Sequence, residues 1–346
     1  MFAKIRSLIF KIDPELAHNL AIKALKLNFN TSSNVEKHSS IETNIFGKTI
    51  NNPIGLAAGF DKDAEVYNSL FKLGFGFVEV GTITPLKQYG NPKPRVFRLE
   101  EDEALINRLG FNNSGAEIVS SRIISNLPSG LLGINIGPNH DTKNRIEDYL
   151  ICIRKFYNLC DYLTINISSP NTENLRSFHN YNELDDLLNA VENEKKILKN
   201  NIPIIVKISP DIEEANIETI SELLIKYNIS AVIISNTTDR NREDLKNINK
   251  LEKGGLSGKP LEKKSNILIN KFYKILKGKI LIIGVGGVDN GKSAYEKIIN
   301  GASLIQLYTG MIYRGPSIIR KISNELIDIF KKEGIKNISE AIGTKN

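Results

Sequence analysis

Short apolar runs alternate with amphipathic stretches along most of the chain, beginning near Asn51. The runs are rich in Ile, Val and Leu, and such continuous apolar segments are typical of strands buried on both faces of a parallel sheet. We predict strands at Ile54–Ala58, Phe77–Val80, Leu131–Ile136, Tyr162–Ile167, Ile204–Ile208, Ala231–Ser235, Ile280–Val285 and Leu304–Leu307. Helical spacing follows each run, at residues 62–73, 115–126, 144–158, 182–198, 212–227, 262–277, 290–300 and 316–332. This alternation predicts an α/β fold of the (β/α)8 TIM-barrel type, with a doubly wound open sheet as the alternative.

The first forty residues show a different pattern, which predicts two short amphipathic helices. The second helix begins at Asp13-Pro14-Glu15, which supplies an N-cap, a proline at N1 and an acid in the first turn. The apolar positions are Phe2, Ile5, Leu8 and Ile9 in the first helix and Leu16, Leu20, Ala24 and Leu27 in the second. Flanking lysines would suit a membrane interface, and packing on the main domain is the alternative. We therefore predict a small N-terminal helical extension at residues 1–40, ending in a polar linker at 28–40, and a barrel at residues 41–346.

Composition narrows the class of protein. A hydrophobic content of 41% and a charged content of 25% are ordinary for a globular protein. The net charge of +7 does not predict nucleic-acid binding, because the lysines are scattered and no basic block interleaves with aromatic residues. Cys152 and Cys160 match no metal or redox motif, so we expect no metal site and no iron–sulfur cluster within the chain. The sequence contains no signal peptide and no apolar run long enough to span a bilayer.

The stretch from Thr164 to Thr172 changes character abruptly where its strand ends. Asn166 places an amide in an otherwise apolar strand, and a buried amide needs polar partners. Pro170 pushes Ser169 towards an extended backbone, which holds the serine side chain in place. Taken alone, this stretch is explained equally well by an ordinary turn or by a ligand site.

The other predicted strands also end in polar residues or glycines, where a barrel of this kind carries its ligand site. The remaining strand ends are Ala58-Gly-Phe-Asp-Lys62, Gly81-Thr82, Asn135-Ile-Gly137, Lys207, Ser235-Asn236-Thr237, Gly284-Val-Gly-Gly287 and Tyr308-Thr-Gly310. The glycines after strands seven and eight fit a phosphate site made of backbone N–H groups and a helix N-terminus. The buried ammonium of Lys207 fits either an internal ion pair or a ligand that becomes anionic, such as a flavin on reduction.

An insertion at residues 83–113 separates the second strand from its helix and contains a hairpin-like run at residues 95–100. Long insertions at this position in a barrel commonly carry function. Residues 173–182, rich in Asn, Glu and Ser, are expected to form a lid over the site.

Nine motifs in order resemble dihydroorotate dehydrogenase, and the similarity is to the quinone-dependent class 2 enzymes of bacteria. The motifs are AAGFDK (57–62), EVGTITP (79–85), PRVFRL (94–99), INRLGFNN (106–113), GINIGPN (133–139), INISSPNT (165–172), SNTT (235–238), GGLSGKPL (254–261) and IGVGG (283–287). The resemblance covers essentially the whole chain and includes the N-terminal helices.

The resemblance implies a barrel that binds FMN and oxidises (S)-dihydroorotate to orotate in pyrimidine (UMP) synthesis. Ser169 would be the catalytic base, and class 1 relatives have a cysteine at this position. The residues implied for FMN are Ala58, Gly59, Lys62, Thr82, Asn135, Asn166, Lys207, Ser235, Gly258, Gly287, Tyr308 and Thr309. Relatives often have Thr in place of Ser235, and the serine keeps a hydroxyl there. The residues implied for the substrate are Lys62, Asn107, Arg108, Leu109, Gly110, Phe111, Asn166, Asn171, Asn236 and Thr237.

The resemblance also implies a proton route and a second substrate. Ser169 would take the C5 proton, and Thr172 with the backbone of Phe111 would hold a water that carries it outwards. His18, Arg98 and Tyr308 would lie near the head of a membrane quinone, in a tunnel formed by the N-terminal helices. We therefore expect peripheral contact with the cytoplasmic face of the bacterial cell membrane, and no iron–sulfur partner subunit.

Three other readings remain open at this point. A class 1-like enzyme would use fumarate or an NAD-linked partner, and Ser169 and the helical N-terminus argue against it. A non-redox barrel that binds a sugar phosphate would need only the glycine loops. A peripheral membrane-binding module would not need the polar strand ends.

Overall fold

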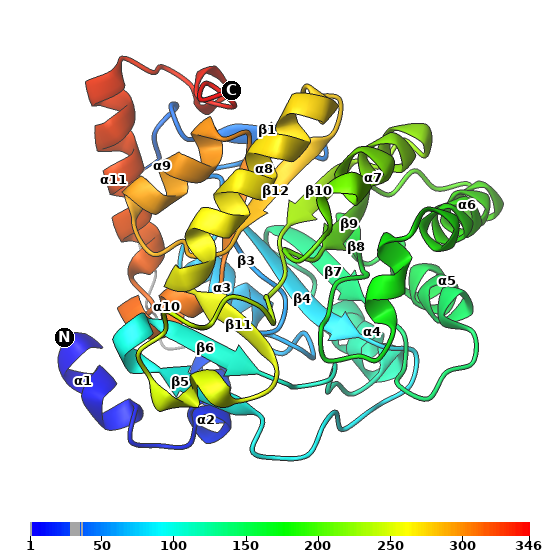
Figure 1. Ribbon diagram of the computed structural model, residues 1–346, viewed down its shortest axis with the longest axis horizontal. Helices are drawn as coiled ribbons and strands as arrows, with labels where there is room; N and C mark the ends of the chain where they lie inside the picture. The colour runs from blue at the N-terminus through cyan, green and yellow to red at the C-terminus, as the bar shows by residue number, and fades with distance from the viewer. Residues whose placement is uncertain (1, 28–34, 36) are drawn as a thin grey trace.

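The computed structural model describes residues 2–27, 35 and 37–346, and eight parallel strands in these residues close into a barrel (Figure 1). The strands in order around the barrel are β3 (Ile54–Leu56), β4 (Phe77–Ile83), β7 (Leu131–Ile136), β8 (Tyr162–Asn166), β9 (Ile204–Ile208), β10 (Ala231–Ile234), β12 (Leu281–Val285) and β13 (Leu304–Leu307). Parallel pairing of β13 with β3 closes the circle, with Ile305 opposite Ile54. The predicted TIM barrel is confirmed, and the open-sheet alternative is wrong.

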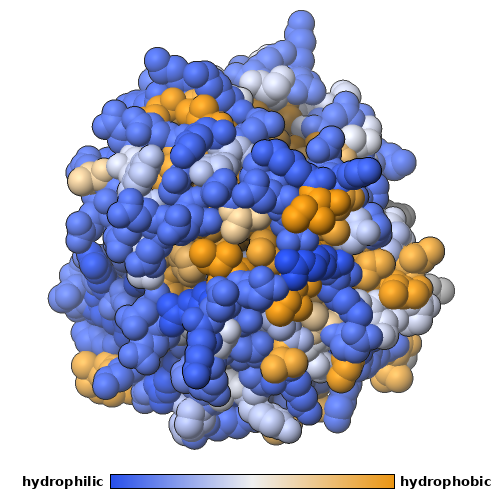
Figure 2. Space-filling view, turned by 90° about the vertical axis from the view of Figure 1, so that its right-hand side faces the viewer, coloured by the Kyte–Doolittle hydropathy of each residue, from blue (hydrophilic) through white to orange (hydrophobic). Residues whose placement is uncertain are grey.

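Helices surround the barrel because each buries an apolar stripe against the outer faces of the strands. They are α3 (Tyr67–Lys72), α4 (Ala116–Ser125), α5 (Arg145–Phe156), α6 (Tyr181–Leu198), α7 (Glu214–Lys226), α8 (Glu262–Leu276), α9 (Gly291–Ile299), α10 (Thr309–Arg314) and α11 (Ile318–Glu333). Short 3-10 turns are η1 (Glu100–Asp102), η2 (Leu175–His179), η3 (Ile248–Leu251), η4 (Lys259–Leu261) and η5 (Ile338–Glu340). The side of the molecule that carries α5 and α6 is mostly hydrophilic, with separate apolar patches (Figure 2).

One predicted helix forms over only half of its predicted range. The helical spacing at residues 62–73 produces a helix only from Tyr67 onward. The Asp61 carboxylate accepts the N–H groups of Glu65 at 2.7 Å and Val66 at 2.8 Å, and residues 59–66 form turns and bends instead. These turns place Gly59 and Lys62 at the end of the barrel where the strands finish.

A hairpin closes the opposite end of the barrel, where the strands begin. Its strands are β1 (Thr43–Ile45) and β2 (Lys48–Ile50). Ile45 and Ile50 pack with Tyr162 and other inward-facing side chains of the barrel. Gly133 makes room for the Tyr162 ring, because a Cβ at residue 133 would lie 2.0 Å from that ring. The barrel is therefore a packed core with its open end on the side where the strands finish.

The insertion after β4 forms a hairpin, as the run at 95–100 predicts. Its strands β5 (Val96–Leu99) and β6 (Ala104–Asn107) join β11 (Gly255–Gly258) in a three-stranded antiparallel sheet over the open end. The Tyr313 hydroxyl of α10 donates to the carbonyls of Leu99 at 3.1 Å and Ala104 at 2.8 Å. This sheet is thereby fixed to the barrel.

Two N-terminal helices, α1 (Phe2–Ile9) and α2 (Pro14–Lys26), lie beside the small sheet (Figure 1). Asp13 caps α2 as predicted, accepting the N–H groups of Glu15 and Leu16 at 3.0 and 2.9 Å. Glu15 forms a two-point ion pair with Arg95, at 3.1 and 2.6 Å. Because a forked guanidinium–carboxylate pair fixes orientation, α2 is anchored to the insertion.

The predicted apolar stripe of α2 does not pack on the barrel. Leu16 is 52% exposed and Leu20 47%, whereas Ile22 is buried at 8%. In α1, Leu8 is 63% exposed. The helices therefore present leucines to the surroundings on one side while packing on the barrel with the other.

The linker predicted at 28–40 falls largely on residues 28–34 and 36, which lie outside the described part of the chain. The division into a unit at 1–40 and a barrel at 41–346 stays a prediction. Among the helices of the described residues, none is long and apolar enough to cross a membrane.

Candidate active site

A cavity of about 180 Å³ lies at the open end of the barrel, between the strand ends and the small sheet. Residues from the ends of β3, β4, β8, β9, β10, β12 and β13, or from the loops that follow them, converge here. The predicted site residues that line it are Ala58, Gly59, Lys62, Thr82, Asn107, Leu109, Gly110, Phe111, Asn166, Ser169, Asn171, Lys207, Ser235, Asn236, Thr237, Gly258, Gly287, Tyr308 and Thr309. The structure thus brings together residues that are up to 251 positions apart, from Ala58 to Thr309.

Five predicted residues lie elsewhere. Asn135 lies below the cavity floor, and Thr172 is buried beside the Ser169 loop without lining the cavity. The Arg108 side chain points away from it, pairs with Glu252 at 2.7 Å and donates to the Pro94 carbonyl at 2.9 Å. This geometry does not support a side-chain role for Arg108 in the substrate wall. His18 and Arg98 line a second cavity.

The charges around the first cavity are one-sided. Lys62 and Lys207 line it, and none of the described lining residues is acidic. Burial lowers the pKa of Lys62 to about 8, with Glu15 and Asp63 opposing that effect. Burial also lowers the pKa of Lys207, and the charge of Glu79 raises it. Because a buried ammonium group without an opposite charge nearby is costly, these two lysines favour an anionic ligand.

Ser169 lies on the loop that follows β8. Its Oγ accepts the backbone N–H of Asn171 at 3.2 Å, which is a short turn of the kind that serine and proline favour. The Asn171 amide donates to Asn107 Oδ1 at 3.4 Å, and so connects this loop to β6 of the small sheet. The hydroxyl therefore has a fixed position at the edge of the cavity.

The floor of the cavity is a set of hydrogen-bonded amides. Asn166 Nδ2 donates to Thr82 Oγ1 at 3.0 Å and to Asn135 Oδ1 at 3.2 Å. Its Oδ1 accepts from Ser168 Oγ at 3.0 Å and from Asn236 Nδ2 at 3.4 Å. The buried amide predicted in β8 therefore has four polar partners within the protein.

Glycine backbone forms one wall. Gly286 and Gly287, after β12, have φ angles of +116° and +78°, which side chains rarely adopt. A Cβ at residue 287 would lie 2.4 Å from the Glu262 Cβ, so this position admits no side chain. Such a loop leaves its backbone N–H groups accessible, as anion sites in barrels require.

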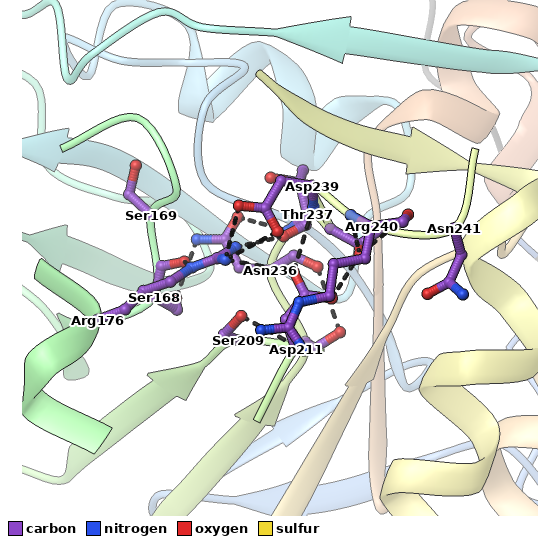
Figure 3. A network of polar contacts seen from close by, with 12 residues as sticks. Ser168, Ser169, Arg176, Ser209, Asp211, Asn236, Thr237, Asp239, Arg240 and Asn241 are labelled. Carbon is purple, nitrogen blue, oxygen red and sulfur yellow. Dashed lines mark hydrogen bonds and ion pairs between the residues drawn. The ribbon is translucent and has the colours of Figure 1, made fainter. Parts of the chain in front are cut away.

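The segment predicted as a lid contains η2 and is held in place by Arg176. The guanidinium donates to the carbonyls of Ser168 and Thr237, each at 3.2 Å. It also reaches the carboxylates of Asp239 at 3.2 Å and Asp211 at 3.3 Å (Figure 3). One side chain thus joins the loop after β8, which carries Ser169, to the loop after β10, which carries Asn236 and Thr237.

A second cavity, of about 450 Å³, lies between the N-terminal helices and the barrel. Its lining is mostly apolar and includes Phe10, Ala17 and Met311, and its charged or polar members include Glu15, His18, Lys62 and Arg98. Both cavities are lined by Lys62, Val96, Leu105, Leu109 and Tyr308. The two cavities therefore share a wall one side chain thick.

Polar groups in the second cavity are tightly held. The His18 ring packs edge-on against Phe60, with centroids 5.1 Å apart. Burial, assisted by the charge of Lys62, lowers the pKa of His18 to about 3, so the imidazole is neutral at physiological pH. Arg98 Nη1 donates to the carbonyls of Phe10 at 3.2 Å and Ile12 at 2.7 Å.

Comparison with known proteins agrees with this arrangement. The sequence profile of the family described as dihydroorotate dehydrogenase matches residues 40–330. The chain belongs to the dihydroorotate dehydrogenase family. The predicted family resemblance is therefore confirmed.

Relatives of this dihydroorotate dehydrogenase family member match over nearly their full length. The dihydroorotate dehydrogenase (quinone) of Bartonella tribocorum is 46% identical over 97% of this chain and 94% of its own. That of Buchnera aphidicola is 47% identical over 93% of this chain and 98% of its own. A crystal structure of the Eimeria tenella enzyme in complex with ferulenol superposes with a TM-score of 0.92 at 38% identity, covering 96% of each chain.

Sequence reasoning missed two polar residues of the site. Arg176 lay inside the predicted lid without a role, and Glu79 lay inside a predicted strand. A charged residue within an apolar strand was a signal for Glu79, because such a residue is buried only with partners. Nothing in the local sequence indicates the partners of Arg176, which come from loops after three different strands.

Proposed function

We propose that this protein oxidises (S)-dihydroorotate to orotate, with a quinone as electron acceptor, in de novo pyrimidine synthesis. The observation that carries the proposal is the pair of adjoining cavities. One contains two lysines and a fixed serine hydroxyl, and none of its described lining residues is acidic. The other is apolar and opens between amphipathic helices.

The residues of the first cavity fit FMN. The glycine wall at Gly286 and Gly287 suits a phosphate, and Lys207 supplies a cation without a hydrogen-bonding protein partner among the described residues. FMN, when bound, would supply the hydride acceptor that the chain itself lacks. The residues proposed to hold it are Ala58, Gly59, Lys62, Thr82, Asn135, Asn166, Lys207, Ser235, Gly258, Gly287, Tyr308 and Thr309. Asn135 would act from below the floor, through Thr82 and Asn166.

Dihydroorotate would occupy the part of the cavity nearest the Ser169 loop. Its carboxylate would pair with Lys62, and its ring amides and carbonyls would bond to the amides of Asn107, Asn171 and Asn236. Leu109, Gly110 and Phe111 would wall the ring, and Thr237 and Asn166 would complete the polar contacts. Ser169 would accept the C5 proton, since its hydroxyl is fixed at the cavity edge. The relay through Thr172 stays a prediction, because Thr172 does not line the cavity.

The second cavity would admit a membrane quinone. Tyr308 separates it from the first cavity, so electrons would cross a wall one side chain thick. The neutral imidazole of His18 and the guanidinium of Arg98 would be the hydrogen-bond donors near the quinone head. Exposed leucines on α1 and α2 would make peripheral contact with the cytoplasmic face of the membrane, beside the entrance.

The class 1-like alternative, with fumarate or NAD as acceptor, has less support. The relatives that match over almost their whole length are named as quinone enzymes. A non-redox phosphate barrel would not need the apolar second cavity.

A side-by-side assay tests the proposal. Purified protein should be yellow with a flavin spectrum, and dihydroorotate should bleach it without oxygen. Turnover should be fast with a ubiquinone analogue and negligible with fumarate or NAD. Turnover of equal speed with fumarate would reverse the choice of acceptor, and colourless protein that cannot be loaded with FMN would refute the flavoenzyme itself.

A further inference from the structure

Glu79, in β4, is a fully buried carboxylate beneath the floor of the first cavity. It accepts four side-chain hydrogen bonds, from Asn135 Nδ2 at 2.8 Å, Gln306 Nε2 at 3.0 Å, Thr164 Oγ1 at 3.1 Å and Tyr162 Oη at 3.2 Å. These donors come from three different strands, β7, β8 and β13. Both carboxylate oxygens of Glu79 are therefore held by donors from the barrel strands.

The hydrogen bonds from the cavity to Glu79 all run in one direction. Asn236 donates to Asn166 at 3.4 Å, Asn166 donates to Asn135 at 3.2 Å, and Asn135 donates to Glu79 at 2.8 Å. Each amide therefore points its NH2 group towards Glu79 and its carbonyl towards the cavity side. Since a carboxylate only accepts hydrogen bonds, Glu79 fixes which way the Asn135 amide faces, and through it Asn166.

Glu79 also acts on Lys207. Lys207 lies opposite Asn166 in the pairing of β8 with β9, and it lines the cavity above the amide chain. The Glu79 charge stabilises the Lys207 ammonium against desolvation. Below the cavity floor, then, one negative charge opposes the positive charge that faces the ligand.

We propose that Glu79 is a positioning residue that sets how readily the bound flavin is reduced. It orients the Asn135 and Asn166 amides, and its buried charge opposes the electron pair that reduction brings into the cavity. The inference rests on the proposed binding of FMN. No catalytic step is assigned to Glu79, because two layers of side chains separate it from the ligand.

The test is the flavin midpoint potential of the Glu79→Gln holoenzyme at pH 8, measured by equilibration with a redox dye. Glutamine keeps the size and an acceptor for Asn135 but removes the charge. The reduction equilibrium should move about tenfold towards the reduced form, which is about 30 mV more positive for a two-electron couple. An equilibrium within twofold of the wild-type value, or one moved towards the oxidised form, would overturn the proposal.

Glu194→Gln is the matched control. Glu194, in α6, is also buried, but it pairs with Arg154 on the outside of the barrel at 2.8 and 2.7 Å. Glu194→Gln should leave the equilibrium constant of flavin reduction within twofold of the wild-type value. A shift as large as that of Glu79→Gln would show that any lost buried charge has this effect, and would overturn the specific role.

Tyr162→Phe decides the matter if Glu79→Gln does not fold. It removes one donor at 3.2 Å and leaves the carboxylate charged and less neutralised. The reduction equilibrium should move about two- to threefold towards the oxidised form, opposite to Glu79→Gln. An unchanged equilibrium, or one moved the other way, would overturn the role. Wild-type protein that binds no flavin would instead refute the proposed function, so the two failures are distinguishable.

Discussion

Among single residues, Ser169 is the one to which the proposed chemistry assigns proton transfer. Its hydroxyl is fixed by the Asn171 N–H at 3.2 Å and lies in the same cavity lining as Lys62 and Lys207, where none of the described residues is a histidine or an acid. A serine in such a place is a weak base whose effect depends on a dry site and a route for the proton.

Ser169→Ala should lower flavin reduction by dihydroorotate about 10²–10⁴-fold, the usual cost of losing a general base. Flavin content should stay at the wild-type level, because the hydroxyl acts on substrate. Anaerobic stopped-flow measures the rate of flavin reduction, and the starting flavin absorbance measures the flavin content. Ser177→Ala, on the neighbouring η2 turn and bonded to the Asn174 carbonyl at 2.8 Å, is the control and should reduce normally. Near-normal reduction in Ser169→Ala would exclude the serine as base.

Lys297 makes a different kind of contribution, to stability. It is fully buried between α9 and α8, bonded to Ser265 Oγ at 3.1 Å and Asn266 Oδ1 at 2.9 Å. Burial lowers the pKa of Lys297 from 10.5 to about 7. Between these two values the unfolded chain binds more protons than the folded protein, so this residue makes the unfolding free energy rise with pH.

Lys297→Met should therefore raise the free energy of unfolding by on the order of 1 kcal/mol at pH 6.5, because a desolvated charge is replaced by an apolar chain of similar size. The gain should shrink as the pH approaches 10. At that pH the lysine of the folded wild-type protein is already neutral, and unfolding lets it bind less than one further proton. Thermal unfolding at several pH values measures this. A gain independent of pH would mean that packing alone is responsible.

Among the elements, the lid and the strand-end loops are held together by Arg176. Its partners are two backbone carbonyls and two carboxylates, and the Asp211 partner is also bonded by Thr238 at 2.5 Å and by Lys264. Asp211 therefore keeps partners when Arg176 is removed. The loops after β8 and β10 would lose the connections through Arg176 and would keep the hydrogen bond from Asn236 Nδ2 to Ser168 Oγ at 2.9 Å.

Arg176→Met should raise KM for dihydroorotate, or slow its reduction of the flavin, by about tenfold, since hydrogen bonds to charged groups contribute roughly 1.5–3 kcal/mol. FMN content should be unchanged. Arg145→Met is the matched control, because Arg145 holds the outer side of the same segment through the carbonyls of Asn174 at 2.9 Å and Glu173 at 2.7 Å. Equal defects in both variants would show that the lid needs only general anchoring.

Sequence patterns predicted the barrel elements unevenly, for physical reasons. Leu131–Ile136, Ile204–Ile208 and Leu304–Leu307 have the predicted bounds, because these apolar strands are buried on both faces. The strand Gly255–Gly258 was not predicted, since its four residues include two glycines and it forms by pairing with Ala104–Asn107. Local pattern does not contain that tertiary partner.

The site was predicted through motif resemblance more than through periodicity. Nineteen predicted residues line the cavity. The Arg108 side chain instead points outward, where it forms an ion pair with Glu252. The spacing of apolar residues in α2 also could not predict which face of the helix points outward. Its leucines face outward because Glu15 and Arg95 fix the rotation of the helix. Such orientations depend on long-range pairs that the spacing of apolar residues does not encode.

At the scale of the whole molecule, the cavity at the strand ends adjoins the apolar cavity beneath the N-terminal helices. Tyr308 and Leu109 belong to both linings. Exposed leucines on α1 and α2 surround the outer cavity but do not all line it. Membrane contact and quinone access can therefore be tested separately.

Leu8, Leu16 and Leu27 are 63%, 52% and 68% exposed and do not line the second cavity. Changing all three to Gln should lower partition onto anionic phospholipid vesicles at least tenfold, because each buried leucine contributes roughly 1.5–3 kcal/mol. Fold stability should change by less than about 0.5 kcal/mol per site, as is usual for surface positions. Cosedimentation with vesicles measures the first effect and thermal unfolding the second.

The matched control is the triple change of Ile124, Leu127 and Ile197 to Gln, at side chains 61%, 74% and 73% exposed on and beside α4 and on α6. It removes as much exposed apolar surface from another side of the barrel and should leave vesicle binding unchanged. In the α1–α2 variant, flavin reduction by dihydroorotate should stay fast, as should reoxidation by a water-soluble quinone analogue. Reoxidation by a long-chain quinone in vesicles should become slow. Equal loss of vesicle binding in both triple variants would contradict a dedicated membrane surface, because it would mean that any exposed apolar residue supports the contact.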